Sequence, residues 1–226
     1  VFWAQNGGCD AYDTDNLKAV RVDYTNGAEG TSATGDINND DSRDAFFAAE
    51  TFKVEGNKEI DVTLKRPFAQ INVGVTAEDW EAAVASNIEI EKSAVVIKNV
   101  ADEINLLTGA VKASDAMANG ITYTLGEIPD ETLYVETDAT KDGKEAYVWL
   151  SMSYILVDDG SESATSVDGA QKSTLNGLKY TFTPKTGNSI EFAQGLAGAP
   201  VQRNWRTNIL GKILTGDIQF NITIDP

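Results

Sequence analysis

The chain contains no histidine and only one cysteine, Cys9, among its 226 residues. Without histidine, the Ser-His-Asp and Cys-His arrangements of many hydrolases cannot form, and nearly all zinc sites lose a usual ligand. A single cysteine excludes a disulfide within the chain, so the fold must be stabilised by packing. We therefore expect a protein that is not an enzyme, and we assign no catalytic, cofactor-binding or metal-binding residues.

Basic residues are scarce, because 18 lysines and arginines accompany 35 aspartates and glutamates, giving a net charge of −17 at pH 7. Such a chain repels phosphate backbones and anionic headgroups, so no nucleic-acid partner is expected. Apolar runs are short, and none reaches the roughly 18 residues of a membrane-spanning helix. The many acidic residues leave a glycosidase-like carboxylate pair open, although no particular pair stands out.

The chain opens on an apolar stretch at residues 1–4 that has the character of a strand interior, with no secretory signal before it. We expect that residues upstream of Val1 have been removed. Cys9 does not lie in a lipoprotein leader, so membrane contact is expected only through a lipid anchor on that missing N-terminal region.

Alternation of apolar and polar residues is the commonest pattern present. It is clearest over residues 217–225, where four apolar side chains alternate with three polar ones: Ile218, Phe220, Ile222 and Ile224 against Gln219, Asn221 and Thr223. A period of two predicts a half-buried strand. Residues 201–215 are predicted to form the preceding strand, with a bend at Gly211.

Other apolar segments predict further strands, at 45–54, 88–100, 121–125, 133–137 and 146–157, and residues 60–75 predict two strand pieces separated near Pro67. The last is nearly continuous, which is typical of a strand buried on both faces. One helix is predicted over residues 77–85, because Thr76 and Asp79 form a capping pattern and Trp80, Ala83 and Val84 share one face. The fold class is therefore all-β, meaning mainly β with one or two short helices.

Many short strands with few helices predict packed β-sandwich domains. We expect residues 1–62 to be the remnant of an incomplete N-terminal β-sandwich domain and residues 63–226 to form a C-terminal β-sandwich domain. The segment 158–173 is of low complexity and predicts a surface loop.

Residues 36–44 space oxygen ligands at alternate positions, as a calcium-binding loop does. The pattern fails at its sixth position, which is Asp41 rather than glycine, and at its twelfth, which is Phe47 rather than glutamate. We interpret it as a polar surface loop and leave calcium binding open. A weaker match at 138–144 is better explained by a hairpin turn at Asp142 and Gly143.

Four tryptophans, Trp3, Trp80, Trp149 and Trp205, are candidates for a sugar-binding platform, but their strand and helix positions favour core packing. The triplet at 221–223 matches a glycosylation acceptor, although the interior of a strand is a poor place for one.

Three blocks of sequence resemble the fimbrillin-type pilins, the type V pilus superfamily of anaerobic Gram-negative bacteria. The first is RNWRTNILG at 203–211, followed by LT at 214–215 and FNITIDP at 220–226. The second, LKRPFAQINV at 64–73, is similar to the Leu-x-Arg-x-x-Ala-x-Ile strand of that superfamily. The third, DSRDAFF at 41–47, resembles a block that some members carry upstream of that strand.

This resemblance implies two transthyretin-like or Greek-key β-sandwich domains and a structural or adhesive subunit of a cell-surface fimbria. In that superfamily, subunits arrive as lipoproteins at the outer membrane and lose an N-terminal strand to proteolysis, and a strand of the next subunit fills the resulting groove. The implied partners are other pilus subunits and ligands on host or bacterial surfaces. The absence of a further strand after residue 226 favours a tip or accessory member over a shaft subunit.

The alternative is a surface carbohydrate-binding β-sandwich lipoprotein. It predicts at least two tryptophans in a solvent-facing row, whereas the pilin interpretation buries them.

Overall fold

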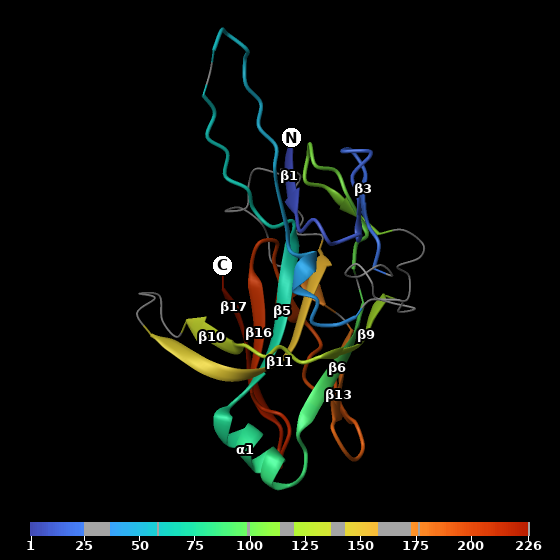
Figure 1. Ribbon diagram of the computed structural model, residues 1–226, viewed down its shortest axis with the longest axis vertical. Coiled ribbons are helices and arrows are strands. Elements are labelled where there is room, and N and C mark those ends of the chain that lie inside the picture. Colours follow the sequence, from blue (N-terminus) through green and yellow to red (C-terminus); the bar gives the residue numbers. More distant parts are fainter. Residues whose placement is uncertain are drawn as a thin grey trace.

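The computed structural model describes residues 1–24, 37–57, 59–98, 100–113, 120–136, 143–157, 173–175 and 177–225. The described chain is mainly β, with several antiparallel sheets and one short α-helix, so the predicted fold class is confirmed at this level (Figure 1). In the part of the chain so described, no helix has the length and apolar character needed to cross a membrane.

The largest sheet has five strands in the order β10-β11-β5-β16-β17. These strands are β10 (Thr132–Glu136), β11 (Lys144–Leu156), β5 (Phe68–Val75), β16 (Arg206–Lys212) and β17 (Gln219–Asp225). Every residue of the central strand β5 is buried. It pairs in parallel with β16, whereas the other neighbours in this sheet are antiparallel.

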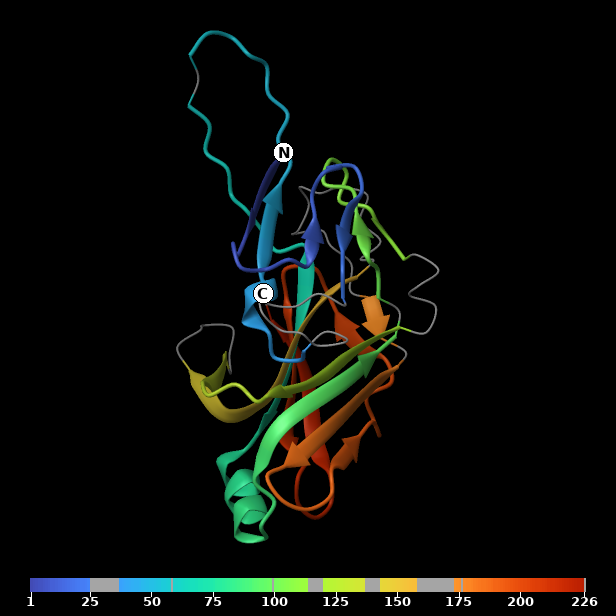
Figure 2. The ribbon, with the colours of Figure 1, turned by 45° about the vertical axis from the view of Figure 1, so that its right-hand side comes forward.

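A second sheet has four antiparallel strands in the order β14-β13-β6-β9. They are β14 (Ile190–Phe192), β13 (Leu178–Pro184), β6 (Ile90–Ile97) and β9 (Ile121–Glu127). One cluster of buried side chains contains residues of both sheets, among them Ile71, Ile209, Val95 and Phe182. The two sheets therefore share a hydrophobic core, and Figure 2 shows β6 and β13 lying across the strands of the larger sheet.

Two of the smaller sheets, those containing β1 and β3, lie toward the end of the molecule opposite the helix (Figure 1). β1 (Phe2–Gln5) pairs with β4 (Ala45–Ala48), and the 3-10 helix η1 (Asp41–Arg43) comes just before β4. A sheet in the order β2-β3-β7-β8 contains β2 (Tyr12–Asp13), β3 (Val20–Val22), β7 (Glu103–Ile104) and β8 (Val111–Lys112). The remaining pair is β12 (Ser173–Leu175) with β15 (Ala199–Val201).

Strand pairing crosses the predicted domain boundary between residues 62 and 63, because β3 pairs with β7. Val20, Val22 and Phe47 also belong to the core cluster that contains both larger sheets. The division into 1–62 and 63–226 remains a prediction.

The single α-helix, α1 (Ala77–Ala85), begins and ends where the sequence predicted. The Thr76 hydroxyl caps it by accepting a hydrogen bond from the Asp79 amide at 3.2 Å. The predicted apolar face was partly wrong, because Ala83 is buried but Val84 is 40% exposed. Asp79 takes the second buried position, since its carboxylate binds main-chain groups of the neighbouring hairpin.

Most predicted strands are present, with one correction near the C-terminal end. The strand predicted over 201–215 is interrupted by a turn at 202–205, where Asn204 has a φ of 62°, and β16 starts only at Arg206. The bend at Gly211 reflects close packing, because a Cβ there would lie 2.2 Å from the Gln219 carbonyl oxygen. The prediction that residues 146–157 are buried on both faces is confirmed from Leu150 to Leu156, whereas Ala146 is exposed and residues 147–149 are half-buried.

Candidate functional site: an open strand edge and a projecting arm

Strand β17 forms one edge of the five-stranded sheet and pairs along its whole length with β16, from Gln219 opposite Lys212 to Asp225 opposite Arg206. Among the described residues, no strand pairs with its outer side. The seven residues alternate as predicted: Gln219, Asn221 and Thr223 are exposed, and Phe220, Ile222 and Ile224 are half-buried. Ile218, predicted to be buried with them, is instead 43% exposed and lies before the strand.

This edge lacks the features that usually prevent pairing with another chain. Natural edge strands are protected by lysine, proline, bulges or a very short length. The outward side chains of β17 are uncharged between Ile218 and Ile224, and its register with β16 is regular. The edge is therefore a template for an added strand.

The apolar row of β17 lies over the hydrophobic core. The rings of Phe220 and Phe192 pack edge to face at 5.1 Å, and Ile222 also contacts the core cluster. Because these side chains are only half-buried, part of their apolar surface faces solvent at the edge. A strand added beside β17 would cover that surface.

Polar contacts fix the C-terminal end of β17. The Asp225 carboxylate accepts a hydrogen bond from the Asn208 side-chain amide and lies 3.4 Å from the Arg206 guanidinium. The Asn208 side-chain oxygen in turn accepts a hydrogen bond from Asn72 at 2.8 Å. This ladder ties β17 to β16 and β5 across the sheet.

The Asp79 carboxylate fixes the start of β17. It accepts hydrogen bonds from the main-chain amides of Ile213, Leu214 and Thr215 at 2.7, 2.8 and 3.0 Å, and from the Thr215 hydroxyl at 2.6 Å. Hydrogen bonds to a charged acceptor are among the strongest in proteins. The turn that leads into β17 is therefore held against α1.

A hollow of about 710 Å³ lies between α1 and the beginning of β17. Its lining mixes charged residues, Glu78 and Lys212, with apolar ones, Ile218 and Phe220. The described residues contain no cluster of three or more Cys, Asp or Glu side chains suited to a metal ion.

A second feature is an arm formed by residues 49–57 and 59–64, which projects away from the body in Figures 1 and 2. The Phe47–Lys65 bridge lies at its base, with mutual main-chain hydrogen bonds of 2.9 and 3.0 Å. Beyond this base, the arm's described residues belong to no strand. Its apolar side chains are unusually open, since Phe52, Val54 and Ile60 are 43%, 80% and 36% exposed.

In the arm, the structure differs from the prediction for two strands. The segment predicted over 45–54 is a strand only as far as Ala48, and of the two pieces predicted over 60–75 only the second, β5, is a strand. Residues 60–64 keep the apolar alternation of a strand but have no partner strand within the described chain. Periodicity alone shows that a segment suits pairing, and not whether a partner is beside it.

The three blocks that resemble fimbrillins meet at the base of this arm. Arg66 binds the Asp44 carboxylate with two hydrogen bonds of 2.7 Å, and the Arg66 amide donates to the Asn204 side chain at 2.9 Å. The guanidinium also lies 4.8 Å from the Phe46 ring centre. The hydrogen bond to Asp44 raises the pKa of Arg66.

The segment interpreted as a polar surface loop, residues 36–44, is only partly at the surface in its described part, because Asn38 and Arg43 are buried, Asp41 is exposed and the others are half-buried. Asp36 lies outside the described residues, as do most of the matches at 138–144 and 158–173. Asn38 is 2% exposed because its side chain binds the hydroxyls of Ser93, Ser151 and Ser153, which joins the two larger sheets.

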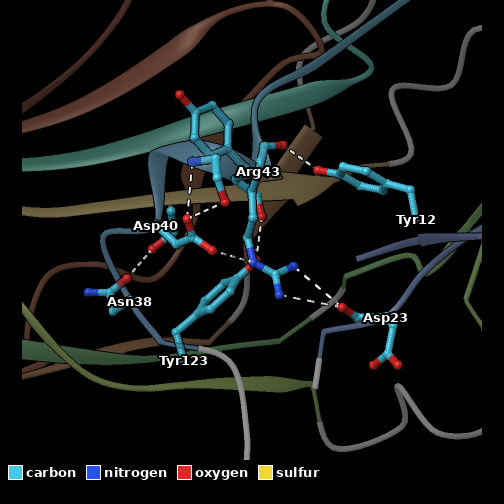
Figure 3. A network of polar contacts seen from close by, with 9 residues as sticks. Tyr12, Asp23, Asn38, Asp40, Arg43 and Tyr123 are labelled. Carbon is cyan, nitrogen blue, oxygen red and sulfur yellow. Dashed lines mark hydrogen bonds and ion pairs between the residues drawn. The ribbon is translucent and has the colours of Figure 1, made fainter. Parts of the chain in front are cut away.

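The same segment contains a buried arginine (Figure 3). Arg43 points its guanidinium at the Asp23 carbonyl, 3.4 and 3.5 Å away, with Asp40 3.7 Å from its Nε and the Tyr123 ring centre 5.8 Å away. Asp40 also caps η1 by accepting hydrogen bonds from the amide and hydroxyl of Ser42. The oxygens of Asn38 and Asp40 thus serve different structural contacts.

The four tryptophans are all half-buried, and three of them, Trp3, Trp80 and Trp149, pack against the core cluster. Trp3 and Trp149 lie in strands as predicted, whereas Trp205 lies in the turn before β16. Asn221 of the possible glycosylation triplet is exposed on β17.

These features define a mainly β protein with two prominent surface elements, the β17 edge and the arm, neither of which has a pairing strand beside it within the described residues. The chain belongs to the family described as "Family of unknown function (DUF6562)", which it matches over residues 1–226. No curated protein matches the chain.

Proposed function

We propose that the protein is a structural or adhesive subunit of a cell-surface fimbria and that it joins its neighbours by β-strand complementation at β17. The observation that carries this proposal is the regular seven-residue outer edge of β17, which has no charged side chain before Asp225. An extended segment added there gains main-chain hydrogen bonds, while the alternating side chains fix its register.

The arrangement of the sheets supports the finer assignment to β-sandwich domains of the transthyretin-like or Greek-key type. Two sheets share one core, as the sandwich interpretation requires. The resemblance of the three sequence blocks adds the expected setting, a lipid-anchored tip or accessory subunit at the outer membrane. Arg66, Asp44 and Asn204 come one from each block and are joined by hydrogen bonds, so the three blocks stabilise the same part of the structure.

Charge also favours β17 as the joining surface. A net charge of −17 makes contact between two copies repulsive over most of the surface. The β17 edge adds no charge of its own between Ile218 and Ile224, so it adds no charge repulsion there to an approaching strand.

The experiment is to place negative charge on this edge. Asn221→Glu combined with Thr223→Glu changes two exposed side chains, so the subunit should still fold, as circular dichroism would verify. We expect at least a tenfold loss of concentration-dependent association, measured by light scattering and by electron microscopy of fibres.

The matched control is Thr122→Glu with Thr132→Glu, which adds the same two charges at exposed positions on the edge strands β9 and β10. Association should be retained in this control. Equal loss in both double variants, or an unaltered chain that stays monomeric at every concentration, would overturn strand addition at β17.

A further inference from the structure

We propose that the strand that covers β17 is residues 59–65, the second limb of the arm with Lys65 at its base, supplied by a second copy of this chain. This inference rests on the proposed function, because it names the donor for the same edge. Donor and acceptor are equal in length, since β17 also has seven residues.

The pattern of the donor matches the pattern of the acceptor. In the arm, Ile60, Val62 and Leu64 alternate with polar residues, as Phe220, Ile222 and Ile224 do in β17. Placed side by side, the two apolar rows lie on the same face of the extended sheet. The apolar side chains of the arm would then cover the half-buried side chains of β17 and would themselves pack at the border of the same hydrophobic core.

The base of the arm sets the direction of its free main-chain groups. Lys65 exchanges both its main-chain hydrogen bonds with Phe47. Successive residues of a strand direct these groups to opposite sides, so Leu64 and, in the same extended conformation, Val62 and Ile60 direct theirs away from β4. The residues with apolar side chains are therefore the ones available to bond a new neighbour.

Main-chain directions select the antiparallel register. The amides of Gln70 and Thr76 donate to the carbonyls of Trp205 and Gly211, so the odd-numbered residues of β16 face β5 and the even-numbered ones face β17. The residues of β17 opposite those even-numbered ones face β16, so Phe220, Ile222 and Ile224 direct their main-chain groups outward. Val62 and Ile222 can then face each other only as a hydrogen-bonded antiparallel pair, because in a parallel ladder a residue that faces its neighbour lies opposite one that faces away.

The contact joins two different surfaces, the arm of one copy and the β17 edge of the next. Such a contact can repeat indefinitely, because each copy still has a free arm or a free edge after one contact has formed. It therefore accounts for fibre growth, which a contact between two identical surfaces does not.

Disulfide trapping tests both the partner and the register. Two full-length variants, Thr63→Cys and Asn221→Cys, each in a Cys9→Ser background, are mixed and oxidised; both residues are exposed. The antiparallel register places residues 63 and 221 side by side, so we expect a cross-linked dimer that contains one copy of each variant.

The control replaces Asn221→Cys with Thr223→Cys, which would face Thr63→Cys only in a parallel register. Cross-linking of this control in preference to the first pair would overturn the antiparallel register we propose. Absence of cross-links in both mixtures, at concentrations where the chains associate, would overturn the arm as donor.

A charge substitution separates this inference from the proposed function. Val62→Lys should reduce association at least tenfold, whereas Val54→Lys on the other limb, a valine that is 80% exposed, should leave association unchanged. If the β17 glutamates abolish association and Val62→Lys does not, the donor is another segment and only this inference fails. If the β17 glutamates have no effect, the proposed function fails with it.

Discussion

The Oδ2 atom of Asp79 lies 2.8 Å from the main-chain nitrogen of Leu214, a residue 135 positions further along the chain. With its contacts to Ile213 and Thr215, Asp79 holds three consecutive amides of one turn. The turn leads directly into β17, so the orientation of the open edge depends on this carboxylate. A preformed edge loses less conformational entropy when it binds a strand.

We predict that Asp79→Asn destabilises the protein by about 2–4 kcal/mol, because an amide retains one acceptor oxygen and turns a donor group toward main-chain N–H groups. Urea unfolding followed by circular dichroism measures the change. Glu78→Gln is the matched control, since it removes one charge from the same helical turn at an exposed position and should have little effect. Equal stability losses in the two variants would show that the turn does not depend on Asp79.

We predict that the Arg66–Asp44 pair contributes a coupling energy of about 1 kcal/mol. The pair has two-point geometry, but its side chains are 37% and 21% exposed, so solvent screening limits its strength. The measurement is a double-mutant cycle with Arg66→Ala and Asp44→Ala in urea unfolding. The Lys185–Glu89 pair, at 54% and 46% exposure, is the control and should show no measurable coupling.

We predict that the protein loses stability above about pH 10, the pKa of an unfolded tyrosine. Burial raises the pKa of Tyr12, Tyr154 and Tyr180 in the folded chain. A folded pKa above the unfolded one means that this stabilisation is complete below the unfolded pKa and is lost as the pH rises toward the folded one. Urea unfolding between pH 7 and pH 11 would detect the loss.

Tyr180→Phe is the informative variant for this pH dependence. The Tyr180 hydroxyl is buried and has no hydrogen-bond partner in the described part of the chain. Removing it should leave stability at pH 7 unchanged or raise it by about 1 kcal/mol. The variant should also show a shallower loss above pH 10, and an unchanged slope would argue that Tyr180 is not a source of the alkaline sensitivity.

The sequence predicted the features that depend on local patterns and missed those that depend on distant partners. The bounds of α1 followed from Thr76 and the helical spacing, and the burial of β11 followed from its apolar run. The burial of Asp79 and Asn38 had no local signal, because their partners are turn amides and serine hydroxyls far along the chain. The arm is the opposite case, since the alternation of residues 60–64 predicted a strand and no strand pairs with them among the described residues.

The last prediction concerns Gly126 in β9, which lies against Asn38, the residue that joins the two larger sheets through serine hydroxyls. A Cβ at Gly126 would lie 1.9 Å from the Asn38 carbonyl oxygen, so the side chain of any other residue must push this segment out from between the sheets. We predict that Gly126→Ala destabilises the protein by at least about 2 kcal/mol, since the shift also breaks the serine contacts of Asn38. Gly7→Ala is the control, because nothing lies within 4 Å of its added Cβ. If thermal unfolding gives the same stability for both variants, the close contact between β9 and Asn38 does not hold the two sheets together.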